Sequence, residues 1–307
     1  RYQNRVGESL ENCVALVRAA SHWNQKATLL EQLVAQAISR AGHDEILQII
    51  STQSLSAAEI EQVRRKLAQI YPDVYPLMSM EGERLAFMDV IQRSFTEGGP
   101  GGGHLTPEYW PELRESPGLD DGDRKYLMPL ETAVCMVHAR RDATIDKVNE
   151  IYEQADKIAG MTPYQRHVSG ISLDNEIMMH GFWPNYKYFL IGIFMPASER
   201  ASEIVYRGKL LHEATVTILA VKQWRLEKGR YPAALTELVS AGRLKELPMD
   251  PFSDKPLVYR KTEDDFTLYS VGENFTDDDG EPGKNRSGQP TKWADNGDTV
   301  FWPLEGS

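Results

Sequence analysis

The side chains of this sequence that could carry acid–base chemistry are its seven histidines and a few acidic residues in helical regions. Two stretches bring a carboxylate and an imidazole close together along a helix, His212 with Glu213 and Glu176 with His180. Such a pair could perform general acid–base catalysis or bind a metal ion. Neither stretch forms a His-Glu-x-x-His motif, and the sequence has no Cys-x-x-Cys or Gly-x-Ser-x-Gly motif. We therefore expect the isolated histidines to be solvated or hydrogen-bonded structural residues.

Other acidic residues of the helical region could converge as paired carboxylates, which many enzymes use as acid and base. They are Glu81, Glu83, Asp89, Glu131 and Asp174. The sequence favours no particular pair among them. The alternative function that they support is an unrecognised hydrolase or lyase, with its site between the helical domain and the apolar segment 177–195. The apolar segment itself is expected to be a core element or a domain interface, with a groove or a membrane-surface contact as the alternative.

Length and composition define the broad class of the protein. The chain has 307 residues, of which 41% are hydrophobic and 26% charged, so it can bury a sizeable core and form two domains. Its net charge of −11 argues against nucleic acid as a partner, because phosphate binding needs clustered basic side chains. No run of about 18 apolar residues predicts a transmembrane helix. We expect a signal or membrane anchor upstream of Arg1, with a chain trimmed to its ordered core as the alternative.

Apolar residues at helical spacing predict a helical region over residues 1–95. Asn24 is a candidate N-cap for the second helix of this region, and residues 42–44 (Gly-His-Asp) are expected to break that helix. Ser56 followed by Glu59 forms a capping box, in which two side chains satisfy backbone amides at the start of a further helix.

A glycine-rich segment interrupts the helical pattern near residues 96–123. Residues 98–103 offer almost no side chains to bury, and they lack the Lys-Ser/Thr end of a phosphate-binding loop, so a surface loop is predicted. Helices are predicted on either side, over residues 80–95 and 129–159.

The last third of the chain changes pattern. A long helix is predicted to begin at Ser198 and to end before Gly229, a residue type that suits the C′ position. Short strands are then predicted over residues 256–259, 266–270 and 299–302. The sequence therefore predicts an α+β protein, with an all-helical domain over residues 1–197 and a small α+β domain over residues 198–307.

Several short motifs follow one another in this last third. In order, they are Gly229-Arg-Tyr231-Pro232, Leu247-Pro-Met-Asp250-Pro251-Phe252, Pro256-Leu-Val-Tyr259, Phe266-Thr-Leu-Tyr-Ser270-Val-Gly272, and Asp295 to Asp298 before Trp302. This ordered set resembles the soluble domain of the major pseudopilin of type II secretion systems. The whole chain resembles large bacterial envelope proteins that have a helical N-terminal region and end in the same module. The resemblance implies a pseudopilin-like fold, a long helix plus an antiparallel β meander, for residues 198–307.

The resemblance also implies a calcium ion, bound by the loop after Gly272 and by later aspartates. The residues that match are Asp277, Asp279, Asp295 and Asp298. Calcium prefers several carboxylate and carbonyl oxygens. Asn274 stands where the family has an aspartate, and the spacing is not that of an EF-hand, because residue 288 is glycine. A solvated acidic loop without metal is the alternative.

The place of the long helix in the chain argues against a pseudopilin-like role in a filament. In a pseudopilin this helix is the N-terminal stem of a filament, whereas here residues 1–197 precede it. We therefore expect a non-enzymatic, extracytoplasmic module for interaction or assembly, stabilised by calcium at its C-terminal loop. Its expected partners are proteins of the cell envelope and not nucleic acid. Membrane contact is expected only through an anchor missing from this chain.

Overall fold

The structure, a computed structural model, describes residues 2–23, 28–106, 135–177, 187–194 and 198–304. Its helices are α1 (Tyr2–Ser21), α2 (Leu29–Thr52), α3 (Ala57–Ala68), α4 (Glu81–Ser94), the 3-10 turn η1 (Pro100–Gly102), α7 (Arg141–Ala159), α8 (Pro163–Ser169), α9 (Leu173–Ile177), α11 (Phe189–Phe194), α12 (Ser198–Lys228) and α13 (Leu235–Ser240). Its strands are β1 (Met249–Asp250), β2 (Lys255–Pro256), β3 (Val258–Lys261), β4 (Phe266–Ser270) and β5 (Thr299–Trp302).

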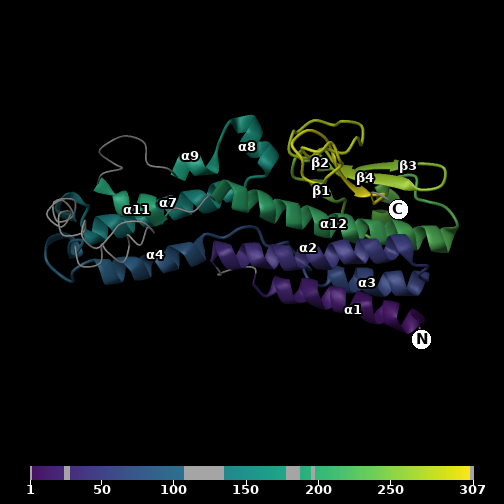
Figure 1. Ribbon diagram of the computed structural model, residues 1–307, viewed down its shortest axis with the longest axis horizontal. Coiled ribbons are helices and arrows are strands. Elements are labelled where there is room, and N and C mark those ends of the chain that lie inside the picture. Colours follow the sequence, from purple (N-terminus) through teal and green to yellow (C-terminus); the bar gives the residue numbers. More distant parts are fainter. Residues whose placement is uncertain (1, 24–27, 107–134, 178–186, 195–197, 305–307) are drawn as a thin grey trace.

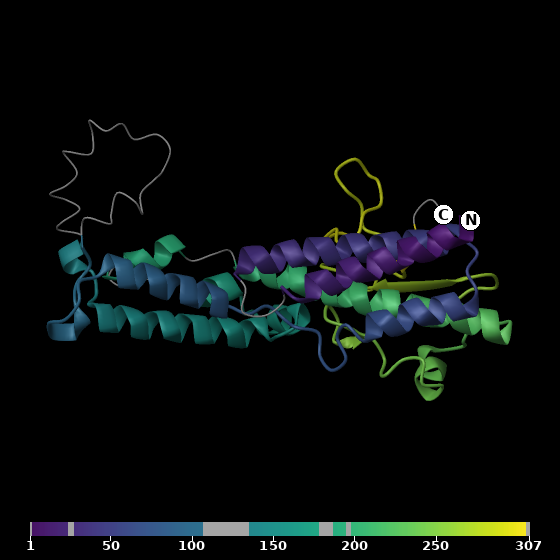
Figure 2. The same ribbon diagram turned by 90° about the horizontal axis from the view of Figure 1, so that it is seen from below.

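Helix α12 runs through the middle of an elongated molecule (Figure 1). In that view α1, α2 and α3 lie below α12, and the strands lie above its C-terminal half. Helices α4, α7 and α11 extend the molecule beyond the other end of α12, as the second view also shows (Figure 2). The molecule is therefore an α+β protein in which one helix supports both the helical layer and the sheet.

Side-chain caps define where several helices begin. The Ser56 hydroxyl accepts from the Glu59 amide at 3.3 Å and the Glu59 carboxylate accepts from the Ser56 amide at 2.8 Å, so the predicted capping box is confirmed. Helix α2 has the same arrangement at Thr28 and Glu31. Its N-cap is thus Thr28 and not the predicted Asn24, which lies outside the described residues.

The predicted break of α2 at residues 42–44 is wrong, because the helix continues to Thr52. Gly42 has a tertiary role instead. A Cβ atom at this position would lie 2.8 Å from Val17 Cγ2 and 2.9 Å from the Cys13 carbonyl oxygen on α1. The glycine therefore allows α1 and α2 to approach closely, which no pattern within α2 reveals.

Two hydrophobic cores follow each other along the molecule. The larger joins α1, α2 and α3 to α12 and the strands, and its buried members include Val17, Ile46, Leu67, Ile218 and Phe301. The smaller joins the starts of α2 and α12 to α4, α7, α9 and α11, and it includes Leu29, Phe87, Val148, Leu190 and Val205. The larger core crosses the predicted division between residues 197 and 198. That division into two domains stays a prediction.

The C-terminal strands form a meander and a separate short pair. Strands β3, β4 and β5 are neighbours in an antiparallel sheet, with Tyr259 opposite Leu268 and Leu268 opposite Trp302. Strand β1 pairs with β2, and β1 was not predicted from the sequence. Gly229 ends α12 with φ +71°, as its residue type predicted, and the chain then turns back toward the sheet.

The segment before α7 departs from the predicted helix over residues 129–159. Residues 129–134 lie outside the described part of the chain, and the chain is not helical at residues 139–140. The Ala139 amide instead donates to the Lys187 carbonyl at 2.8 Å, and α7 begins at Arg141. Within the described residues, no helix is both long enough and apolar enough to cross a membrane.

Candidate functional site

Asp250 connects the two small sheets. Its side chain is 1% exposed, and its Oδ1 accepts from the Phe252 amide at 3.0 Å and from Ser270 Oγ at 2.8 Å. Its Oδ2 accepts from the Val271 amide at 3.0 Å and from Ser253 Oγ at 3.3 Å. Burial raises the pKa of Asp250, and these donors act in the opposite direction. Asp250 of the sequence motif thus anchors β1 to the end of β4.

The acidic loop after β4 is organised by a second buried carboxylate. Asp298 is 1% exposed, and it accepts from the Asp278 amide at 3.2 Å and from the Gly280 amide at 2.6 Å. Burial raises the pKa of Asp298, and both amides lower it. Because these two amides lie 18 and 20 residues earlier in the chain, Asp298 closes the loop onto the start of β5.

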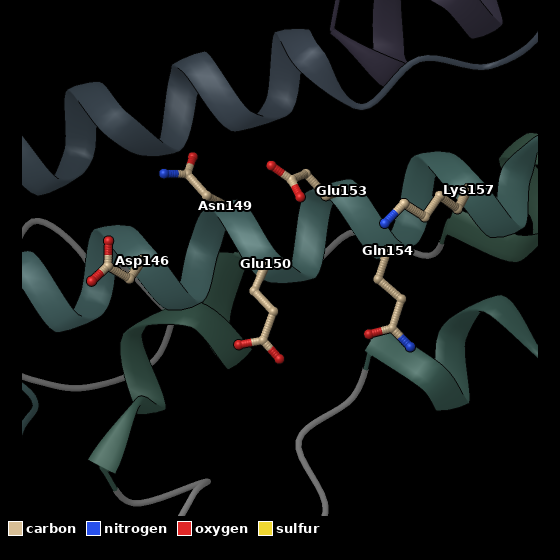
Figure 3. A pocket seen from close by; sticks show the side chains of 6 residues that line it. All are labelled: Asp146, Asn149, Glu150, Glu153, Gln154 and Lys157. Atoms are coloured by element: carbon tan, nitrogen blue, oxygen red, sulfur yellow. The ribbon is translucent and has the colours of Figure 1, made fainter.

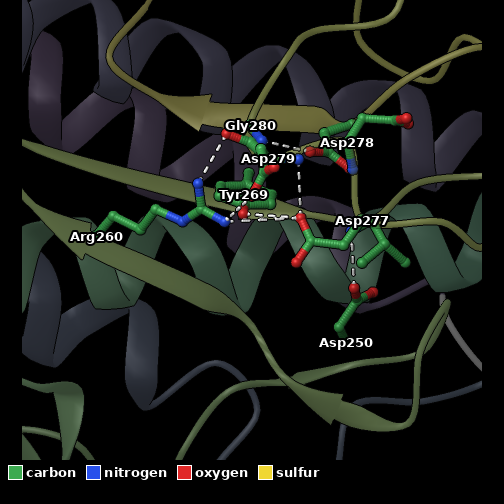
Figure 4. Close-up of polar contacts among 9 residues, drawn as sticks. Asp250, Arg260, Tyr269, Asp277, Asp278, Asp279 and Gly280 are labelled. Atoms are coloured by element: carbon green, nitrogen blue, oxygen red, sulfur yellow. Dashed lines mark hydrogen bonds and ion pairs between the residues drawn. The ribbon is translucent and has the colours of Figure 1, made fainter.

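Two of the other predicted calcium ligands, Asp277 and Asp279, have protein partners as well (Figure 4). Asp277 Oδ1 accepts from the Tyr269 hydroxyl at 2.9 Å, and Asp279 Oδ1 pairs with Arg260 Nη2 at 2.7 Å. The same Arg260 nitrogen lies 3.9 Å from Asp277 Oδ1. Asp295 is exposed. The structure therefore brings Asp277 and Asp279 together around a guanidinium group.

The carboxylates of this loop are a ligand type that suits calcium. Arg260 pairs with Asp279 and lies near Asp277, and the Asp298 oxygens accept from backbone amides. Across the described ranges, no group of three or more His, Cys, Asp or Glu side chains is placed to hold a metal ion. Calcium binding by Asp277, Asp279, Asp295 and Asp298 stays a prediction.

Two buried histidines form a pair that sequence spacing could not reveal. His43 Nε2 on α2 lies 3.0 Å from His212 Nδ1 on α12, and His43 Nδ1 lies 2.8 Å from the Ser39 carbonyl oxygen. A carbonyl only accepts, so His43 Nδ1 carries the proton and its Nε2 accepts from His212 Nδ1. Burial lowers the pKa of His43 to about 4 and also lowers the pKa of His212. Both rings are therefore neutral at pH 7.

Of the two candidate acid–base pairs, only His212 with Glu213 lies within the described residues, and these two side chains have other partners. His212 binds His43, and Lys209 Nζ donates to Glu213 Oε1 at 2.6 Å. His180 lies outside the described residues, as does the side chain of Glu176. Neither stretch therefore provides a carboxylate–imidazole pair in the described part of the chain.

Four of the acidic residues considered for a catalytic pair have separate structural partners. Glu81 binds Arg84 at 2.7 Å, and Glu83 accepts from the Leu29 amide at the start of α2 at 2.7 Å. Asp174 accepts from the Ser198 amide at 2.9 Å and from the Glu199 amide at 3.0 Å, so it caps α12. Asp89 binds Arg93 at 2.8 Å on the surface of α4, and Glu131 lies outside the described residues.

An open groove of about 460 Å³ runs along α7 (Figure 3). Its lining residues are Asp146, Asn149, Glu150, Glu153, Gln154 and Lys157. In Figure 3, Glu150 and Glu153 point to different sides of the helix, so they do not form paired carboxylates. Asn149 is engaged by Arg84, whose Nη1 donates to its Oδ1 at 3.1 Å. The groove thus has the character of a polar helix surface.

Comparisons of this chain with models of known protein families, with curated proteins and with solved structures found no match.

Proposed function

We propose that this chain is a non-enzymatic interaction or assembly module that works outside the cytoplasm, with proteins of the cell envelope as partners. The observation that carries the proposal is the covering of α12 on two sides, by α2 and α3 and by the sheet (Figure 1). This arrangement gives a long, continuously packed scaffold. Among the acidic side chains considered for catalysis, Glu83 and Asp174 accept hydrogen bonds at helix starts, and Glu81 and Asp89 form ion pairs.

We also propose that residues 198–307 form a pseudopilin-like unit. The roles of the matched residues support this. Gly229 ends the long helix, the Tyr259 hydroxyl donates to the Pro232 carbonyl at 2.9 Å, and Trp302 stacks on Phe266 with ring centroids 5.9 Å apart. These contacts join the helix, the turn and the meander, and they are what supports the proposal.

Assembly through a free α12 stem is not part of the proposal, because α2 and α3 cover that helix. The proposed partner surface is instead the region around the α1–α2 turn, where large apolar side chains are exposed. Trp23 is 49% exposed, Leu30 is 71% exposed and Val34 is 40% exposed. Leu30 and Val34 are four residues apart on α2 and therefore share one face. We call these three residues the hairpin patch.

The hairpin patch can be tested with surface substitutions. Leu30→Glu combined with Val34→Glu adds charge to exposed positions, so the melting temperature should stay unchanged while binding to envelope proteins is lost. Val168→Glu is the matched control, because Val168 is 67% exposed on α8, away from the patch. Envelope proteins should co-purify with the wild type and the control alike. If envelope proteins co-purify equally well with the double variant, the patch is not their binding surface. The location has a separate test: a reporter fused to the natural protein that is active only in the cytoplasm would contradict a place outside it.

The predicted calcium site has its own test. Because Asp277, Asp279 and Asp298 already have protein partners, we expect the same melting temperature in calcium chloride and in EDTA. Arg260→Met removes the guanidinium between the first two carboxylates, and it should lower the melting temperature in EDTA. A clear rise of the wild-type melting temperature with calcium would instead establish the metal site.

A further inference from the structure

Residues 71–77 belong to the irregular connection between α3 and α4, and they pack against His212. The Tyr71 ring lies edge-on to the His212 ring at a centroid distance of 5.0 Å, and the Tyr75 ring lies 6.0 Å from it. Tyr75 is 5% exposed, whereas residues 72–74 are exposed. We call residues 71–77 the strap.

Side chains hold the strap, and backbone pairing does not. Among the described residues, no backbone–backbone hydrogen bond involves the strap. The Tyr75 hydroxyl donates to Gln36 Oε1 on α2 at 2.9 Å, and Lys245 Nζ donates to the Pro72 carbonyl at 3.1 Å. Segments with few backbone hydrogen bonds open at the lowest cost in free energy. The strap can therefore move without unfolding a helix.

The histidine pair beside the strap has room for one proton between its rings. His43 Nδ1 donates to the Ser39 carbonyl, so His43 Nε2 accepts from His212 Nδ1 at 3.0 Å. A proton added at His43 Nε2 requires His212 to carry its own proton on the far nitrogen, Nε2. A second added proton places two N–H donors face to face. The rings are 1% and 6% exposed, so water cannot hydrate these charges while the strap is closed.

Several charged and titratable side chains surround the pair. They are Arg40 and Asp44 on α2, Lys209 and Glu213 on α12, Tyr71 and Tyr75 on the strap, Lys245 and Glu246 after α13, and Lys292, which pairs with Asp44. Burial lowers the pKa of His43 to about 4, whereas the charge of Asp44 raises it. Burial also lowers the pKa of His212, as do the charges of His43 and Lys209. The closed arrangement therefore favours neutral rings.

We propose that the strap is an acid-sensitive cover of the His43–His212 pair, which lifts when both histidines are protonated and closes when they lose these protons. Lifting the strap lets water reach His212. Helices α2 and α12 stay together, because both contribute to both hydrophobic cores. A hydrated histidine takes up its proton near pH 6.5, so the closed form is favoured above that pH and the open form grows as pH falls toward about 4. This device is independent of the hairpin patch.

Fluorine NMR of a fluorotyrosine at position 75 of the intact chain reports whether the strap is closed. We expect a buried resonance at about pH 7.5 and its replacement, toward about pH 4.5, by one at the shift of free fluorotyrosine. Fluorotyrosine at position 152 is the control, because Tyr152 is 2% exposed and belongs to the same core as Tyr75. It should keep its buried resonance. Loss of both buried resonances together would show that the core itself unfolds, and it would overturn the proposal.

Nitrogen NMR of the histidine rings connects the opening with its cause. In the wild type, His43 and His212 should become protonated over the same pH range in which Tyr75 becomes exposed. Protonation of both rings with Tyr75 still buried would contradict the proposal, as would exposure of Tyr75 with both rings still neutral.

Variants of the pair give a second test of the strap. His43→Leu with His212→Phe should keep the buried resonance of position 75 at about pH 4.5, because no ring is left to take up a proton. His104→Gln is the matched control, since His104 is exposed, and it should open like the wild type. Opening in acid by the folded double variant would sink the proposal. If the double variant does not fold at about pH 7.5, the coincidence of protonation and exposure in the wild type decides.

Discussion

Buried polar residues join segments that are far apart in this sequence, and Asp250 is the clearest case. Replacing it by Ala removes the acceptor of the Phe252 and Val271 amides and of the Ser270 hydroxyl. A buried donor that loses its acceptor costs about 1–3 kcal/mol, and water that enters the space can satisfy some of these donors. We therefore expect the free energy of unfolding to fall by about 3 kcal/mol. Urea denaturation measures it. Asp264→Ala, at an exposed position, should change stability by less than about 0.5 kcal/mol.

The His43–His212 pair predicts how stability depends on pH. Burial lowers the pKa of His43 from 6.5 to about 4, so below pH 6.5 the unfolded state binds more protons than the folded state. The stability contributed by the neutral pair is present above that value and is lost as pH falls toward 4. The charge of Lys209 also lowers the pKa of His212, whereas the charge of Asp44 raises the pKa of His43.

Urea denaturation at about pH 7.5 and about pH 5 tests the pair, with an expected loss of about 2 kcal/mol from His43 alone. His43→Leu combined with His212→Phe removes both titrating rings and should shrink the difference between the two pH values. His104→Gln, at an exposed position, should keep the wild-type difference. An unchanged pH dependence in the double variant would show that other groups are responsible.

Among the elements, the contact between α1 and α2 depends on Gly42. Gly42→Ala places a Cβ atom 2.8 Å from Val17 Cγ2, and we expect a loss of about 1–3 kcal/mol despite the better helix propensity of alanine. Gly7→Ala on α1 is the control, because nothing lies within 4 Å of its Cβ position. That variant should gain about 0.5–1 kcal/mol in thermal or urea denaturation. Equal effects of the two substitutions would contradict the close approach.

Elements whose signals are local could be predicted from the sequence, and those that depend on distant contacts could not. The Ser56–Glu59 cap and the strand over residues 266–270 are encoded by neighbouring residues, and both are confirmed. Gly42 reads locally as a helix break, but its neighbours on α1 give it another role. Asp174 caps α12 from 24 residues away, and His43 meets His212 across 169 residues. No spacing rule covers such pairs.

At the scale of the whole molecule, the larger core makes the N-terminal helices and the sheet interdependent. Leu210, Ile218 and Trp224 of α12 belong to a core that also contains Ile46 and Leu67. Residues 198–307 as an isolated fragment would expose that side of α12, so we expect the fragment to lose cooperative thermal unfolding. Circular dichroism and the dispersion of amide NMR signals measure this. A fragment that melts cooperatively at the temperature of the full chain would support two independent domains instead.

The hairpin patch is the surface proposed to bind a protein of the cell envelope. The most direct measurement places a photo-crosslinking amino acid at Leu30, or at Val168 as the control, in the full-length natural protein within its own cells. Both positions are highly exposed, at 71% and 67%. We predict a discrete adduct with an envelope protein from position 30, none from position 168, and loss of the adduct when Val34→Glu is added. The absence of any adduct at position 30, or the same adducts at both positions, would contradict the proposal that the hairpin patch binds an envelope protein.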